Sequence, residues 1–135
     1  MARTFKVARG LHPDFDGAFD AAKKDSVDAV VVLSTPVTTP HRTQIAVAAA
    51  KHRLPTLSPR DHDDAGSLMC YGTSFAALTR RAAGYVDSIL KGAQPGDLPV
   101  ETVRQPELIL NRRAARALGL TLPASVLSQV TRVVE

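Results

Sequence analysis

Aromatic residues are scarce in this chain, which has 135 residues with two tyrosines, four phenylalanines and no tryptophan. A hydrophobic core must therefore be built mainly from Ala, Val, Leu and Ile. The hydrophobic share is nevertheless 44%, and the charged share is 22%, which is typical of a folded globular chain rather than a disordered one. The length suits a single domain covering residues 1–135.

Cysteine is almost absent, because Cys70 is the single one, and this excludes both an internal disulfide and a cysteine metal cluster. No apolar run approaches the roughly 20 residues that are needed to span a bilayer. The N-terminus lacks the apolar stretch of a secretory leader. As written, the chain is expected in the cytoplasm unless it was cut from a larger exported protein.

Motifs of enzymes and cofactor-binding proteins are missing too. There is no Gly-x-Ser-x-Gly elbow, no Walker-type phosphate loop and no Gly-x-Gly-x-x-Gly pattern. His12, His41 and His52 stand apart, so their spacing supports no Ser-His-Asp arrangement. We therefore predict that the chain is not an enzyme and carries no cofactor.

Charged residues do not point to a metal or to nucleic acid. The acidic stretch 61–64 (Asp-His-Asp-Asp) has ligand-type side chains, but neighbours in sequence rarely aim at one centre. A solvated loop at the rim of a binding cleft is the favoured interpretation. The net charge is +4, with basic residues such as Arg80, Arg81 and Arg112 dispersed on polar helix faces without interleaved aromatics. We predict no nucleic-acid partner.

Hydrophobic periodicity predicts strands that alternate with helices. Strands are expected at about 4–9, 27–33, 54–57, 67–71 and 107–110, and helices at about 15–24, 40–51, 75–90, 112–118 and 123–134. Residues 27–33 are almost continuously apolar, as in a strand that is buried on both faces of a parallel sheet. The alternation predicts an α/β fold, a Rossmann-like parallel sheet flanked by helices.

Open sheets of this kind bind ligands beyond the carboxyl ends of their strands. The segments at those ends are 10–12, 34–36, 58–61, 71–74 and Asn111. Hydroxyl groups there could bond a carboxylate or amine, and an aromatic ring could stack on a small organic ligand. The candidate ligand-binding residues are Ser34, Thr35, Pro36, Asp61, Tyr71, Gly72 and Thr73. Ordinary turns and helix caps remain the alternative, with Thr39 as the expected cap of the helix that starts at Pro40.

Several segments resemble one known family. Residues 85–101 follow the pattern Tyr-Val-Asp-x-Ile-Leu-Lys-Gly-Ala-x-Pro-x-Asp-Leu-Pro-Val-Glu, and 49–55, 68–72, 107–111 and 117–123 match further stretches in order. Cys70 stands where the family usually has Ser. On these residues the chain resembles, over about 14–135, the ABC-transporter solute-binding proteins whose characterised members bind aromatic amino acids.

The resemblance implies a periplasmic-binding-protein fold, with two Rossmann-like lobes around a ligand cleft. The chain would be the single C-terminal lobe, and so partial relative to the two-lobed family. It implies a small organic solute such as an amino acid, bound weakly by the lone lobe and without catalysis. It also implies an ABC permease as the partner of the full-length protein and a periplasmic location.

Parts of the family pattern are missing, namely most of the first lobe and the opening strand and helix of the second. In the order 2-1-3-4-5, the missing first strand would leave a gap inside the sheet. We expect a second copy or a shifted N-terminal segment to fill it, so a homodimer is predicted. The alternatives are a cytoplasmic α/β module that acts by homodimerisation or regulation, and, with less support, a flavodoxin-like enzyme.

Overall fold

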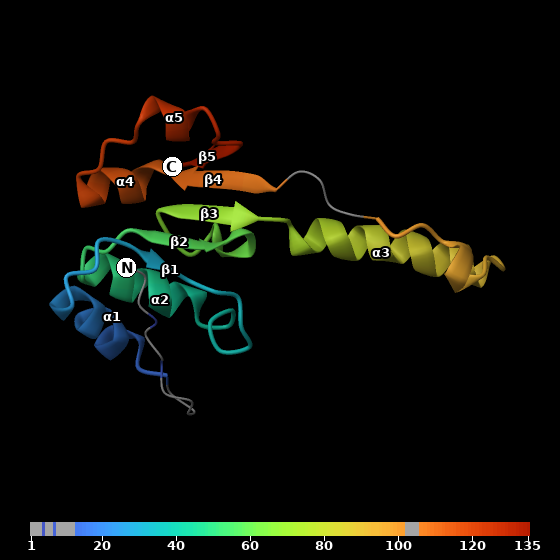
Figure 1. Ribbon diagram of the computed structural model, residues 1–135, viewed down its shortest axis with the longest axis horizontal. Helices are drawn as coiled ribbons and strands as arrows, with labels where there is room; N and C mark the ends of the chain where they lie inside the picture. Colours follow the sequence, from blue (N-terminus) through green and yellow to red (C-terminus); the bar gives the residue numbers. More distant parts are fainter. Residues whose placement is uncertain (1–3, 5–6, 8–12, 102–105) are drawn as a thin grey trace.

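The computed structural model describes residues 4, 7, 13–101 and 106–135, and its five strands form one sheet in the order of the chain (Figure 1). The strands are β1 (Val30–Val31), β2 (Thr56–Pro59), β3 (Met69–Gly72), β4 (Glu107–Asn111) and β5 (Arg132–Val134). The helices are α1 (Phe15–Lys24), α2 (Arg42–Lys51), α3 (Phe75–Leu90), α4 (Arg112–Leu118) and α5 (Ala124–Leu127), with one-turn 3-10 helices η1 (Arg60–His62) and η2 (Pro95–Asp97). The predicted α/β class is confirmed.

Strand direction changes once across the sheet. The strands β1, β2 and β3 are parallel, whereas β4 and β5 are parallel to each other and antiparallel to β3. The expected parallel pairing is therefore wrong at β3 and β4, where Gly72 at the end of one strand lies opposite Glu107 at the start of the other. The reason is that the chain leaves the sheet through α3 and re-enters it at the edge from which it left.

One core cluster joins α1 and α2 to the first strand. The side chain of Asp14 caps α1 by accepting a hydrogen bond from the Gly17 amide at 2.8 Å. The apolar stripe that follows is buried, with Phe15 and Phe19 packing against Ile45 of α2 and the neighbouring alanines. This packing fixes both helices over one face of β1 and β2.

A second cluster fixes α4. Leu68, Leu110 and Ala115 are its buried members. Asn111 caps α4, because its side-chain oxygen accepts from the Ala114 amide at 2.9 Å. Gly119 ends the helix in the left-handed conformation, with φ of 70°, which favours glycine.

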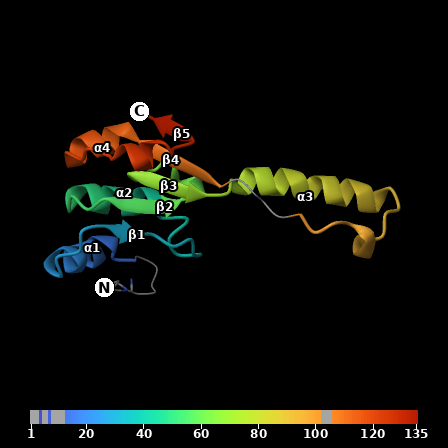
Figure 2. The same cartoon turned by 45° about the horizontal axis from the view of Figure 1, so that its top comes forward.

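The helix α3 stands away from the sheet in both views of the molecule (Figures 1 and 2). Its boundaries agree with the predicted helix at 75–90. Ser74 caps it by accepting from the Ala77 amide at 3.3 Å. Its apolar stripe is uncovered, since Phe75, Val86 and Leu90 are 71%, 56% and 81% exposed. The sequence pattern thus identified an apolar face that the described residues do not bury.

The prediction that strand 27–33 is buried on both faces is wrong. Its sheet segment is two residues long, and it lies at the end of the described sheet. Val30 and Val32 pack against the core cluster, but Val31 and Leu33 are 66% and 70% exposed. The apolar composition is real, yet one face and one edge of the strand have no cover among the described residues.

Two helix predictions also need correction. The helix expected from Pro40 starts at Arg42, because residues 36–41 form turns, and His41 rather than Thr39 precedes it. The final helix expected over 123–134 is a single short helix, α5, followed by β5. The β-branched pair Val133–Val134 pairs with β4 instead of continuing the helix.

Several expectations fall on residues that are mostly not described. The strand at 4–9 lies outside the described residues except for Thr4 and Val7, which are not in a strand. The described sheet runs without a gap from β1 to β5, so the gap expected inside the sheet is absent from the described strands. In the described part of the chain, no helix has the length and apolar character needed to cross a membrane.

Candidate functional site

The candidate residues lie at the edge of the sheet where the carboxyl ends of its first three strands meet. Since β1, β2 and β3 are parallel, the segments that follow them (34–36, 60–61 and 72–74) leave from the same edge, which is also the edge from which α3 departs (Figure 1). Asn111 is wrongly placed by the sequence analysis. It ends β4, which runs in the opposite direction, so it lies at the other edge. Residues 10–12 lie outside the described residues.

The loop after β1 is a network of hydroxyl groups. The Thr35 hydroxyl accepts from the Val37 and Thr38 amides at 3.2 and 3.0 Å, and the Thr38 hydroxyl donates to the Leu33 carbonyl at 2.6 Å. Ser34 and Thr39 pair through their hydroxyls at 3.3 Å. These bonds shape the loop, while Ser34, Thr35 and Pro36 remain exposed to solvent. The hydroxyls of Thr35 and Ser34 thus both form hydrogen bonds within the loop.

The end of β3 supplies the aromatic group of the edge. Tyr71 is 53% exposed, and Gly72 and Thr73 follow it in a half-buried stretch. Gly72 has φ of 134°, a conformation that side-chain-bearing residues rarely adopt. A Cβ there would lie 3.7 Å from the Cβ of Arg60, an ordinary contact, so the backbone conformation and not lack of space favours glycine.

The acidic stretch after β2 is divided among separate partners. The carboxylate of Asp61 accepts from the Phe75 amide at the start of α3, at 3.1 and 3.3 Å. Asp63 contacts Arg132 of β5, and Asp64 pairs with Arg42 of α2 at 3.1 Å. The hydrogen bonds from Arg42 lower the pKa of Asp64. Asp61, predicted to bind ligand, has its carboxylate on a helix terminus instead.

His62 points inward from the same stretch. It is 2% exposed, and its Nε2 atom has no hydrogen-bond partner among the described residues. Burial lowers the pKa of the imidazole, and the neighbouring Arg42 lowers it further, against the opposing charges of Asp61 and Asp64. A neutral imidazole is therefore the stable form in the folded lobe.

Cys70 is buried, at 2% exposure, on the central strand. Burial raises the pKa of its thiol to about 12. A thiol with that pKa is protonated at neutral pH and is a poor nucleophile.

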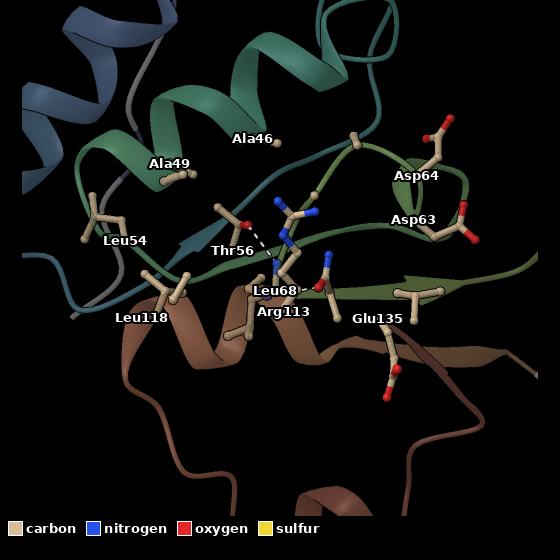
Figure 3. A pocket seen from close by; sticks show the side chains of 17 residues that line it. Ala46, Ala49, Leu54, Thr56, Asp63, Asp64, Leu68, Arg113, Leu118 and Glu135 are labelled. Atoms are coloured by element: carbon tan, nitrogen blue, oxygen red, sulfur yellow. Dashed lines mark hydrogen bonds between the residues drawn. The ribbon is translucent and has the colours of Figure 1, made fainter.

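One groove was not predicted from the sequence. It is a groove of about 490 Å³ between α2 and α4 on the helix-bearing face of the sheet (Figure 3). Ala46 and Ala49 line the α2 side and Leu118 the α4 side, and Figure 3 shows Arg113 extending from α4 into it. It exists because the β2–β3 connection carries only η1, which is too short to cover that face. The candidate ligand residues are not among its lining.

The fold and the edge define a class of protein before any comparison. Its parallel strands end in exposed hydroxyl-bearing turns, and open α/β sheets in general bind small molecules beyond such strand ends. The sequence profile of the family described as "ABC transporter substrate binding protein" matches residues 11–134. The chain belongs to this family.

Comparisons with individual proteins agree with that assignment. A tyrosine-binding protein of Clostridioides difficile is 26% identical over 94 residues, which are 69% of this chain and 25% of that protein. The crystal structure of a conserved domain protein from Vibrio cholerae has a TM-score of 0.76 and 26% identity, covering 90% of this chain and 41% of that one. The chain thus spans less than half the length of these relatives.

A third comparison supports the fold. The structure of an ABC domain in complex with L-Trp from Streptococcus pneumoniae has a TM-score of 0.75 and 21% identity, and it covers 90% of this chain and 42% of that chain. The family resemblance noted in the sequence is confirmed, as is its partial extent.

Proposed function

We propose that the chain is the solute-binding half of an ABC-transporter binding protein, and that it binds a small organic solute such as an amino acid without catalysing a reaction. The observation that carries this is the shared edge at which the exposed loop 34–36 and Tyr71 follow parallel strands. Backbone and hydroxyl groups there suit the carboxylate and amine of an amino acid, and the Tyr71 ring suits an apolar side chain.

The names of two relatives point to the chemistry of the solute. One is called tyrosine-binding, and another was crystallised with L-Trp. We therefore propose an aromatic amino acid as the solute class. The site is open on one side, because Ser34, Thr35 and Tyr71 are all exposed. A site that is open on one side makes fewer contacts with its ligand. We therefore expect a Kd in the millimolar range, which corresponds to a binding free energy of about 4 kcal/mol.

Titration of the labelled chain with L-Trp, L-Tyr and L-Phe in two-dimensional NMR tests this proposal. Because the chain has no tryptophan, the fluorescence anisotropy of L-Trp itself gives a second readout. We expect shift changes at 33–36 and 71–74, and their loss in Tyr71→Ala. The matched control is Tyr85→Phe, which removes the hydroxyl that donates to the Pro99 carbonyl. Shift changes confined to the α2–α4 groove would show that this edge is not the site.

We propose that the permease and the location follow those of the family. A two-lobed binding protein delivers its solute to an ABC permease outside the cytoplasm, and this chain would serve there as one lobe. Co-purification with a permease encoded beside it, dependent on added solute, is the expected result. A chain that stays in the cytoplasm when expressed from its own genomic context would contradict this location.

We also propose a homodimer through the edge of β1 that the described residues leave unpaired. The backbone amides of Val30 and Val32 donate hydrogen bonds on the β2 side at 2.9 Å. Because backbone groups alternate in direction along a strand, those of Val31 point away from β2. The exposed side chains of Val31 and Leu33 add an apolar surface beside this edge. An open apolar edge readily pairs with another strand, and a two-fold axis would pair β1 with its own copy.

Analytical ultracentrifugation tests the dimer. The wild-type chain should sediment as a dimer at tens of micromolar, whereas Val31→Lys should sediment as a monomer with unchanged circular dichroism. Val47→Lys, on the exposed side of α2, is the matched control and should remain dimeric. A wild-type chain that is monomeric at every concentration tested rules out the proposal.

A further inference from the structure

The segment that contains α3 is joined to the sheet at two adjacent points. We use "arm" for residues 75–101, which hold α3, η2 and the returning stretch. The chain enters the arm just after Gly72 and returns to the sheet at Glu107, and these two residues face each other across the β3–β4 pair. Each residue of α3 is at least partly exposed, so packing does not fix the direction of the arm.

Contacts within the arm join α3 to the returning stretch. The Tyr85 hydroxyl donates to the Pro99 carbonyl, and Arg81 pairs with Glu101 at 2.8 Å. These contacts hold the returning stretch against α3. They leave the angle between the arm and the sheet undetermined.

The helix η1 contacts both of the arm's attachment points. On the outgoing side, the carboxylate of Asp61 accepts from the Phe75 amide, the first residue of α3. A carboxylate at a helix N-terminus is favoured by the helix dipole as well as by the hydrogen bond. On the returning side, the Arg60 Nε atom donates to Glu107 at 2.7 Å.

The two contacts are linked to each other and to the sheet. The guanidinium of Arg60 lies 3.8 Å from the Asp61 carboxylate and 3.6 Å from that of Asp63, which in turn contacts Arg132 of β5. The side chain of Arg60 is only 19% exposed, so these interactions are less screened by solvent than those of a surface pair. The network therefore runs from the last strand of the sheet to the first turn of α3.

We infer that Arg60 and Asp61 form a clamp that sets the direction of the arm relative to the sheet. In this role they are positioning residues. The inference does not depend on the proposed solute or on the dimer, and it gives Asp61 a structural role in place of the ligand-binding role predicted from the sequence.

Pulsed electron paramagnetic resonance between spin labels tests the clamp. Labels are attached at Lys23→Cys on α1 and Gln94→Cys at the far end of the arm, in a Cys70→Ala background. Asp61→Ala and Arg60→Ala should each broaden the distance distribution about two-fold, because the arm then moves as on a loosened hinge. Arg42→Ala, which removes the neighbouring ion pair to Asp64, is the matched control and should leave the width unchanged.

Two further measurements separate loss of direction from loss of structure. A label pair within the arm, at Arg80→Cys and Gln94→Cys, should keep its distance in every variant, since α3 itself stays folded. Glu107→Gln keeps the size of the side chain and removes its charge, and it should broaden the body-to-arm distance if Ala variants fold poorly. An unchanged body-to-arm distribution in folded Asp61→Ala and Glu107→Gln would overturn the inference.

Discussion

At the scale of single residues, His62 links the stability of the lobe to pH. Its imidazole is buried, its Nε2 atom has no partner in the part of the chain that the structure describes, and the charges of Arg42, Asp61 and Asp64 act on it. Burial lowers its pKa below the ordinary value of 6.5. As pH falls, the unfolded chain therefore takes up a proton at His62 at a higher pH than the folded chain does.

We expect the free energy of unfolding to fall between about pH 7 and pH 5 because of this residue. The contribution of neutral His62 to the free energy of unfolding is fully present above about pH 6.5, and acidification below that pH removes it. Urea denaturation at both pH values should show a smaller loss in His62→Leu. Equal pH slopes in wild type and His62→Leu would rule out this role.

Cys70 gives a second residue-scale prediction. Because its thiol is buried and has a pKa of about 12, thiolate is scarce in the folded lobe. A thiol reagent at pH 8 should label the folded chain at least about 100-fold more slowly than the chain in urea. Rapid labelling without denaturant would mean that the β2–β3 region opens readily.

At the scale of elements, the cap of α4 should have a measurable effect on stability. Asn111→Ala removes the acceptor for the Ala114 amide and should lower the free energy of unfolding by about 1 kcal/mol. Asn111→Asp keeps an acceptor at the same position and should cost less than half of that. Chemical denaturation of the three proteins makes the comparison, and equal stabilities for all three would contradict the cap.

Local signals predicted elements better than they predicted contacts. The start of α3 at its Ser74 cap and the end of α4 at Gly119 follow from side-chain and backbone chemistry within a few residues. The apolar residues of β1 and α3 were equally clear, but periodicity identifies an apolar face without saying whether this chain covers it. For this reason Val31 was predicted to be buried, whereas it is 66% exposed in the structure.

The candidate site was predictable only in part for the same reason. The strand ends at Ser34 and Tyr71 follow from the βα alternation, and the structure places them at one edge. The bond between Asp61 and α3, and the groove beside Arg113, depend on where α3 and η1 lie in space. No pattern in the sequence gives the positions of α3 and η1. These positions depend on the reversal of strand direction between β3 and β4, which the sequence did not predict.

At the scale of the whole molecule, the arm and the sheet should differ in stability. A helix of 16 residues that buries none of its side chains has little tertiary support, and isolated helices of that length are marginal in water. Amide hydrogen exchange should therefore be fast in α3 and slow in β2, β3 and β4. Protection of α3 equal to that of β3 would indicate that a partner or second copy covers the arm in solution.

The antiparallel neighbours Gly72 and Glu107 make the arm an insertion within a β-hairpin. A tight Asn-Gly turn is enough to connect two such strands. Excising residues 73–106 and closing the gap with that turn should therefore yield a continuous mini-lobe, which keeps the five-stranded sheet and sheds the protruding helix.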